Sequence, residues 1–349
     1  MARRVSFGVA LYTGQRAAED GRPLYQDAAR LAQAAEAAGF DVIWLSEHHG
    51  WADGYLPSPL MVAAAVAATT SRIRIGTGLA VAPLHNPVRL AEDAAVVDHL
   101  AGGRLLLGLG AGYLPKEFRA AGSEWAARGR RLEETVAVLR AAWTGRPFTH
   151  QGSIFNLEDV TVTPAPVQRP LPIWIGAYAP AAVERAGRVA DGHLVGRAAP
   201  GVVEAVSEML ARHRDPQDPG FTFGVNVSTV LEEPDGAAAQ ALEGYARQQL
   251  AYEAVQVEHD AYAGRIGGRG RAREETLALG EIRNYVQAIG DAASVVDQIA
   301  ATLEPAQRWA RLHVALRVIF PEPDVDAQCR RLAALGARVL PGLRAKLSD

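Results

Sequence analysis

The 349-residue sequence lacks the features that mark disulfide-bonded, zinc-binding or membrane proteins. Its only cysteine is Cys329, so no intramolecular disulfide can form, and cysteine–histidine metal clusters are excluded. Cys329 lies in a helical pattern (DAQCRRLAAL), which favours a buried inert thiol over a nucleophile. No uncharged apolar run reaches 18 residues, so no membrane span is predicted.

Excess charge is also missing. The formal net charge is −3 at pH 7, without a long run of either sign, so the electrostatic footprint of a nucleic-acid-binding protein is absent. The arginine-rich residues 267–274 (GGRGRARE) are few and interspersed with glycine, which predicts a solvated loop. The first residues (MARRVSFGVALY) include only a short apolar run and no cleavage-like site. They predict a first strand rather than a signal peptide, and we expect a cytoplasmic protein.

What the sequence does contain is a regular alternation of short apolar runs and helical patterns. The runs are residues 5–12, 41–46, 73–81, 104–109, 172–175, 193–195, 221–230 and 312–318. They are continuous rather than alternating, which indicates strands buried on both faces of a parallel sheet. Eight consecutive β/α units favour a single closed (β/α)8 TIM-type barrel over an open doubly wound sheet.

Two long segments interrupt the alternation, after strands four and seven. They cover about residues 113–170 and 231–290, and the first contains a helical pattern at 126–143 and a hairpin around 148–163. Both follow the carboxyl ends of strands, where barrel insertions form lids and substrate walls. No linker marks a domain boundary, so residues 1–349 are predicted to form one domain.

Glu47, His48 and His49 follow the second predicted strand directly. Adjacent side chains of an extended segment point in opposite directions, so the two histidines should not share one role. One could face the barrel mouth while the other braces the following loop. The mouth-facing imidazole could exchange a proton with a bound intermediate near neutral pH, or both rings could be structural. A metal site is not predicted, because no third ligand has a recognisable spacing.

Glycines are frequent at the predicted strand ends. Gly76 and Gly78 suggest a bulge where a flat ligand lies against the main chain, although ordinary strand termination explains them equally well. Residues 107–113 (LGLGAGY) imitate a dinucleotide-binding fingerprint, but Tyr113 stands in its sixth place and no clean helix follows. A Rossmann site is therefore rejected, although the segment leaves room for a large ring at the barrel mouth.

The segment at 172–180 (PIWIGAYAP) has the order strand, glycine, short turn and proline, and a helix follows at 181–190. Proline suits the first turn of a helix. The free amides and the dipole at a helix N-terminus bind anions without a positive side chain. A phosphate-bearing cofactor is therefore predicted at this turn.

Four segments together resemble the bacterial luciferase-like flavin-dependent oxidoreductases. They are AAEAAGFDVIWLSEHH, TSRIRIGTGLAVAPLHNPVRLAEDAAVVDHLAGGRLLLGLGAGY, RGRRLEETVAVLRAAWTG and PAPVQRPLPIWIGAYAPAAVERAGRVADGHL. The resemblance is close over residues 5–200 and looser at 289–300 and in the last helix. It implies a barrel, usually homodimeric, that binds reduced FMN or the deazaflavin F420 across the strand carboxyl ends.

The resemblance also implies roles for single residues. His48 matches the catalytic histidine, Gly78-Leu79 the non-prolyl cis peptide behind the flavin ring, and residues 176–178 the phosphate turn. The cofactor-binding residues expected are Glu47, Thr77, Gly78, Leu79, Gly110, Gly176, Ala177 and Tyr178. The candidate substrate-pocket residues, for which structural packing is the alternative, are Trp51, Tyr55, Tyr113 and Phe155.

By this resemblance, the leading hypothesis is a two-component monooxygenase that oxygenates a small organic substrate. A separate reductase would supply reduced FMN, O2 would be the oxidant, and His48 would act as acid/base or hydrogen-bond donor. The alternatives are an F420-dependent hydride-transfer oxidoreductase and a flavin-binding relative without catalysis. A homodimer is expected, and the alanine-rich helices at 58–70 and 87–100 could form its interface or could pack on the barrel.

Overall fold

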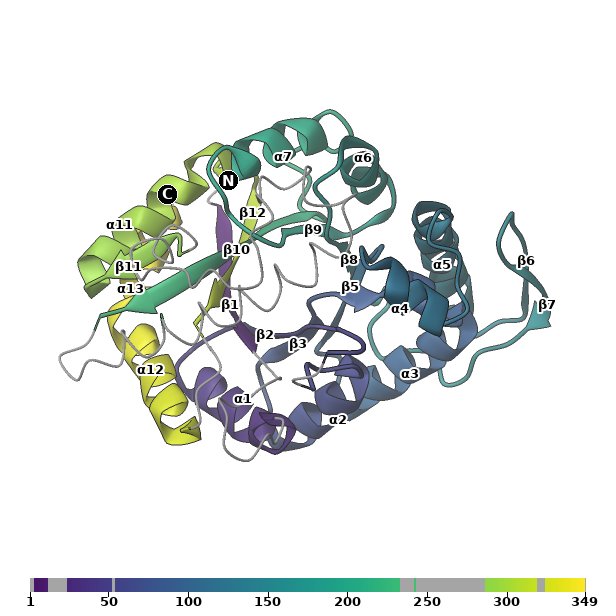
Figure 1. Ribbon diagram of the computed structural model, residues 1–349, viewed down its shortest axis with the longest axis horizontal. Helices are drawn as coiled ribbons and strands as arrows, with labels where there is room; N and C mark the ends of the chain where they lie inside the picture. Colours follow the sequence, from purple (N-terminus) through teal and green to yellow (C-terminus); the bar gives the residue numbers. More distant parts are fainter. Residues whose placement is uncertain are drawn as a thin grey trace.

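A closed parallel barrel forms the centre of the molecule (Figure 1). The computed structural model describes residues 3–11, 24–51, 54–232, 242, 286–318 and 324–348. Within these residues the strands follow the order β10-β12-β1-β2-β3-β5-β8-β9, and β9 pairs with β10 to close the ring. The barrel strands are β1 (Arg4–Leu11), β2 (Val42–Leu45), β3 (Arg74–Thr77), β5 (Leu105–Gly110), β8 (Ile173–Ile175), β9 (Gly192–Val195), β10 (Thr222–Leu231) and β12 (Arg311–Arg317). The predicted (β/α)8 barrel is confirmed, and each predicted strand has its counterpart.

Helices cover the outside of the ring (Figure 1). They are η1 (Leu24–Asp27), α1 (Ala28–Ala37), α2 (Pro59–Thr69), η2 (Ala82–Leu84), α3 (Pro87–Leu100), α4 (Pro115–Ala120), α5 (Arg128–Ala142), α6 (Pro180–Val189), α7 (Val202–Ala211), α11 (Ala292–Leu303), η4 (Glu304–Ala306), α12 (Val325–Arg338) and α13 (Leu340–Leu347). Helix α3 shows a local start signal, because the Asn86 side chain accepts from the amides of Val88 and Arg89. None of the helices described has the length and apolar character needed to cross a membrane.

Most barrel strands contribute to two apolar layers. On β2, Ile43 and Leu45 belong to the large cluster between the sheet and the helices. Val42 and Trp44, which alternate with them, belong to a smaller cluster inside the barrel. Side chains of a strand alternate between its faces, so both faces must be apolar. This burial explains the continuous apolar runs of the sequence.

Two tryptophans and a histidine fill the middle of the barrel. Trp44 and Trp174 have ring centroids 5.3 Å apart, and each lies 5.4 Å from the ring of His313. Trp44 Nε1 donates to His313 Nε2 at 2.8 Å, so the proton of His313 is on Nδ1, which lies 2.9 Å from Ser6 Oγ. Burial, with a smaller effect of the Arg74 charge, lowers the pKa of His313 to about 3. The layer is therefore uncharged at neutral pH.

Inward-facing glycines make room for these tryptophans. A Cβ on Gly76 would lie 2.3 Å from Trp44 Cε3, and a Cβ on Gly192 would lie 2.6 Å from Trp174 Cε2. Both distances are far below contact distance. The space that Gly76 leaves is thus occupied by a core side chain rather than kept open for a ligand.

The structure departs from the predicted elements in three places. The third predicted strand is divided at a cis peptide bond between Gly78 and Leu79, after which β4 (Ala80–Val81) pairs with β5. An additional strand, β11 (Ala288–Gly290), pairs in parallel with the end of β10. Helix α5, predicted within an insertion, packs between α3 and α6 as one of the barrel's covering helices.

The predicted hairpin is present as β6 (Phe148–Gln151) and β7 (Asn156–Val160). It projects from the side of the molecule, at the right-hand edge of Figure 1. The predicted loop at 267–274 and most of the predicted insertion at 231–290 lie outside the described residues. The extent of both insertions therefore stays a prediction.

Candidate active site

A cavity of about 250 Å³ lies at the carboxyl ends of the barrel strands. This is the end at which barrel enzymes carry their active sites. The predicted site residues that line it are Glu47, His48, Tyr55, Gly78, Leu79, Gly110 and Tyr113. The structure thus brings together side chains from the ends of β2, β3 and β5 and from the loops that follow them.

Glu47 lies at the edge of the cavity, where its carboxylate joins a hydrogen-bond network with His49. Glu47, whose side chain has no exposed area, accepts from His49 Nε2 at 2.7 Å, from His85 Nε2 at 2.8 Å and from the Val81 amide at 2.7 Å. Burial would raise the pKa of Glu47, but these hydrogen bonds outweigh it and lower the pKa to about 2. The hydrogen bond to Glu47 raises the pKa of His49. Glu47 is thus an anion that ties the loop after β2 to β4 and η2.

Helix α4 joins the same network. Glu117 accepts from the His49 amide at 3.1 Å, and burial raises the pKa of its carboxyl group. The network consists of acidic and imidazole groups, yet it is not a metal centre. Across the described ranges, no three histidine, cysteine, aspartate or glutamate side chains are arranged to hold a metal ion.

His48 lines the cavity, and its ring is held by aromatic neighbours. It stacks on Tyr55 with centroids 4.1 Å apart and planes at 18°, and it meets the ring of Trp51 edge-on at 5.9 Å. The Tyr55 hydroxyl lies 2.8 Å from Ser46 Oγ, and this hydrogen bond fixes the tyrosine ring on which His48 stacks. Burial and then the positive charge of Arg317 lower the pKa of His48 to about 3. The imidazole is therefore neutral at physiological pH, with one ring nitrogen that can donate a hydrogen bond and one that can accept.

Two neighbouring histidines thus have different environments. His49 is hydrogen-bonded to a buried carboxylate, whereas His48 lies against an aromatic ring at the cavity. This is the division of orientation that the extended segment predicted. The catalytic role of His48 stays a prediction.

Leu79 shapes the wall next to the cis peptide bond. A Cβ on Gly176 would lie 2.2 Å from Leu79 Cδ1, and one on Gly110 would lie 3.3 Å from the same atom. The amide of Gly176 donates to the Leu109 carbonyl at 3.1 Å. Gly176 therefore serves the barrel by admitting Leu79 and by extending the sheet's hydrogen bonds.

Two polar residues of the cavity, Asn226 and Arg317, received no role from the sequence. Asn226 Oδ1 is buried and has no hydrogen-bond partner among the described residues. Both side chains line the cavity, from β10 and from the end of β12. The signal that could have found them is a polar residue inside an apolar strand, as in FGVNVSTV and LHVALRV.

Several predicted site residues lie beyond the cavity lining. Thr77 is fully buried and donates to the Gly108 carbonyl at 2.7 Å. Phe155 precedes β7 of the hairpin, and the Arg131 guanidinium lies 4.7 Å from its ring centroid. The remaining four are Trp51, Gly176, Ala177 and Tyr178, of which Trp51 contacts His48 and Tyr178 approaches the cavity residue Gly196. A Cβ on Gly196 would lie 2.6 Å from the Tyr178 hydroxyl.

Known proteins resemble this chain in sequence. The oxygenase component of a flavin-dependent trigonelline monooxygenase from Acinetobacter baylyi is 33% identical over 162 residues, 46% of this chain and 45% of the relative. An F420-dependent glucose-6-phosphate dehydrogenase from Kineococcus radiotolerans is 37% identical over 172 residues, 48% of this chain and 51% of the relative. The chain thus spans about half the length of these curated relatives.

Solved structures share the fold over nearly the whole chain. The oxygenating constituent of 3,6-diketocamphane monooxygenase from Pseudomonas putida, a type II Baeyer–Villiger monooxygenase in complex with FMN, superimposes with a TM-score of 0.74. It is 17% identical and covers 97% of this chain and 98% of its own. The family described as luciferase-like monooxygenase matches residues 5–306, which confirms the predicted resemblance. The chain belongs to the luciferase-like monooxygenase family.

Proposed function

We propose that the protein is a flavin-dependent monooxygenase that uses reduced FMN and O2 to oxygenate a small organic substrate. The observation that carries the proposal is the neutral, stacked imidazole of His48 in a cavity at the active end of the barrel. One oxygen atom would enter the substrate and the other would leave as water, with two electrons from the reduced flavin. Family membership supports oxidoreductase chemistry.

The cavity residues fit a flavin ring system. The buried acceptor Asn226 Oδ1 would receive an N–H of the ring, and Leu79 would support one ring face. The cofactor phosphate would lie beyond Gly196, at the amides of Ala177 and Tyr178 and the first turn of α6, whose N-cap residue Ala179 gives no side-chain cap. Glu47, Thr77 and Gly176 are cofactor-binding residues in the sequence-based prediction. In this arrangement they would affect cofactor binding indirectly, by shaping the loops and strands around the cavity.

When bound, reduced FMN supplies the electrons that activate O2. His48 would donate a hydrogen bond to, or exchange a proton with, the reacting oxygen, because its ring is neutral and its orientation is fixed by Tyr55. Tyr55 and Tyr113 would contact the substrate, and Arg317 would attract partial negative charge that develops beside His48. Tight enclosure would keep water from the reacting groups.

A separate flavin reductase is the partner we propose. The A. baylyi and P. putida relatives are named as the oxygenase component and the oxygenating constituent of their systems, which supports a chain that receives its flavin reduced. A reductase acting in trans would supply that flavin in solution.

F420-dependent hydride transfer is the alternative, and it would use the same neutral imidazole of His48 at the cavity. An alcohol substrate would pass a hydride to the deazaflavin and its hydroxyl proton to His48, which yields a carbonyl compound. The K. radiotolerans relative is named as an F420-dependent enzyme, so the cofactor titration below includes F420.

We also propose a homodimer through α2 and α3. Met61 on α2 and Val96 and Leu100 on α3 are large apolar side chains that are 75%, 47% and 55% exposed. A dimer interface along these two neighbouring helices would cover these exposed apolar side chains. Sedimentation velocity should give a dimer for the native protein and a monomer for Met61→Glu combined with Leu100→Glu. A native monomer would exclude the dimer.

Anaerobic titration separates the two cofactors. We expect reduced FMN to bind in the low micromolar range, with quenching of Trp44, and F420 to bind at least about tenfold more weakly, a difference of about 1.4 kcal/mol. The reverse order would establish the alternative, and binding of neither would overturn both.

Asn226→Ala supplies the matched variant for this titration. Loss of its acceptor should weaken reduced FMN about tenfold, whereas Asn156→Ala, on the exposed hairpin, should leave binding unchanged. Equal affinity in the two variants would remove Asn226 from the flavin site.

A further inference from the structure

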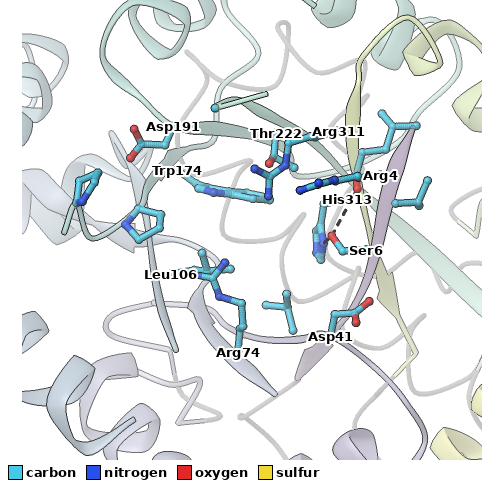
Figure 2. A pocket seen from close by; sticks show the side chains of 16 residues that line it. Arg4, Ser6, Asp41, Arg74, Leu106, Trp174, Asp191, Thr222, Arg311 and His313 are labelled. Carbon is cyan, nitrogen blue, oxygen red and sulfur yellow. Dashed lines mark hydrogen bonds between the residues drawn. The ribbon is translucent and has the colours of Figure 1, made fainter. Parts of the chain in front are cut away.

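A second cavity lies at the opposite end of the barrel, where the strands begin. Its volume is about 290 Å³, and we call it the floor cavity. Its charged and polar lining residues include Arg4, Arg74, Arg311, Asp41, Asp191 and Thr222. Figure 2 shows Arg4 and Arg311 in the upper half of the cavity and Arg74 entering it from below.

The three arginines converge because of strand register and alternation. Arg4 on β1 is the register partner of Arg311 on β12, and Arg74 begins β3. Inward-facing residues recur at every second position of a strand, and each arginine occupies one of these positions. Arg311, for example, comes two residues before the inward-facing His313. All three side chains therefore point toward the inside of the barrel at the end where the strands begin, and all three line the floor cavity.

No carboxylate within the described chain forms an ion pair with these arginines. Asp191 is engaged by Arg140 at 2.5 Å and accepts from the Ile173 amide at 2.8 Å. Asp41 accepts from the Phe7 amide at 2.7 Å.

The other described contacts of the three guanidinium groups are neutral. Arg74 donates to Gln168 Oε1 at 2.9 Å, and Arg311 donates to the Pro219 carbonyl at 2.9 Å. Burial and then the charge of Arg311 lower the pKa of Arg74, against a smaller opposing effect of the Asp98 carboxylate. Like charges gathered in a partly enclosed space are costly unless an anion compensates them.

We propose that the floor cavity binds a small oxyanion of the phosphate type, either inorganic phosphate or the phosphate group of a small phosphomonoester. Guanidinium groups bind phosphate oxygens through paired hydrogen bonds, and three arginines from different strands match a tetrahedral, multivalent anion better than a monocarboxylate. The Thr222 hydroxyl supplies a further donor. At about 30 Å³ per water, the cavity holds on the order of ten waters, which is ample room for a small anion.

The site is independent of the proposed flavin chemistry. The layer of Trp44, Trp174 and His313 separates the floor cavity from the one that contains His48. An anion at the floor would bridge β1, β12 and β3. Strands β1 and β12 come from the two ends of the chain, and β3 lies two places from β1 in the ring. Its expected effect is therefore on the stability of the closed barrel.

Calorimetric titration of the whole protein with inorganic phosphate, in chloride buffer of constant ionic strength, tests the proposal. We expect saturable one-to-one binding, unchanged when the protein is saturated with FMN. No saturable binding would overturn the proposal, and so would competition by FMN, because competition would place phosphate at the flavin end. Glycerol 3-phosphate in place of phosphate distinguishes the two sources: tighter binding favours a phosphomonoester, and weaker binding favours the free ion.

Arginine variants locate the site. Arg311→Gln should weaken phosphate at least about tenfold, or about 1.4 kcal/mol, while Arg89→Gln, an exposed arginine on α3, should bind as the native protein does. Arg4→Gln decides the matter if Arg311→Gln does not fold, since Arg4 is exposed and makes no described side-chain hydrogen bond. Native affinity in both floor variants would overturn the proposal.

Discussion

The two ends of the barrel enclose cavities of similar size, about 250 and 290 Å³, yet their linings are different. Strand β3 begins with Arg74 at the floor and leads to Gly78 at the mouth, and β1 begins with Arg4 and reaches Ala10. The mouth is thus lined mostly by uncharged residues, with Glu47 and Arg317 as its charged members, whereas the floor lining includes three arginines and two aspartates. Volume alone does not distinguish a catalytic end from a structural one; the chemistry of the inward side chains does.

The mouth depends on a second set of groups beneath its wall. Replacing Glu47 by Ala would leave His49, His85 and the Val81 amide without their shared acceptor. Removing one partner of a buried charged network costs about 3–5 kcal/mol of unfolding free energy. Because the two histidines are partly exposed, we expect the lower end of this range, about 3 kcal/mol. Urea unfolding measures it. This is the largest effect that we expect, because no floor residue has as many buried partners.

Glu47→Gln is the control, since its amide oxygen can still accept from Val81. We expect it to lose clearly less stability than the alanine variant. If Glu47→Ala cost under about 1 kcal/mol, the network would not be what holds the mouth in shape.

The second prediction concerns chemistry at the mouth itself. His48→Ala should lower coupled substrate oxygenation about 100-fold, the lower range for loss of a general acid or base, and release hydrogen peroxide instead. Product and peroxide are measured together in the presence of a flavin reductase. Reduced FMN should still bind within a few-fold of the native affinity.

Tyr55→Phe is the matched variant, because it keeps the stacked ring and removes only the hydroxyl. We expect it to retain most of the coupling. If coupling were unchanged in His48→Ala, His48 would have no role in the reaction. The chemistry of His48 would then no longer distinguish the mouth from the floor.

The barrel was predictable because its signal is local. Continuous apolar runs such as 104–109 report burial on both faces, and their repeated spacing reports β/α units. The same argument predicted that His48 and His49 point apart, since it needs only the alternation of an extended segment. The cis peptide bond between Gly78 and Leu79 was implied by the family resemblance, whereas the division of strand three at that bond was not predicted.

The rest of the site depends on contacts between distant parts of the chain. Gly76 was interpreted as room for a ligand, but the space belongs to Trp44, 32 residues earlier in the pairing of β2 with β3. Likewise, nothing local in the sequence around Phe155 shows that its hairpin leaves the barrel. Arg4 and Arg311 are more than 300 residues apart, so the floor cavity became visible only in the closed ring.

The layer between the two ends supplies the third prediction. Gly76→Ala would place a Cβ 2.3 Å from Trp44 Cε3, and the indole is fixed by its bond to His313. Overpacking of this kind costs about 1–3 kcal/mol. Gly110→Ala would place a Cβ 3.3 Å from Leu79 Cδ1 and 3.4 Å from Leu79 Cβ, much nearer to ordinary contact, and should cost less in urea unfolding. Equal costs would mean that the middle layer yields as easily as the mouth.

The smallest effect that we expect comes from protonation of the same layer. Because the pKa of His313 is lowered to about 3, the unfolded chain binds a proton near pH 6.5 and the folded chain does not. Stability should therefore fall as pH drops below 6.5, by about 2 kcal/mol at pH 5 from this group. His313→Gln keeps an acceptor for Trp44 and removes the titration, so its urea midpoint should depend less on pH over this range. If the pH dependence of His313→Gln equalled that of the native protein, His313 would take up its proton in the folded barrel. The layer between the floor and the mouth would then be charged rather than neutral at low pH.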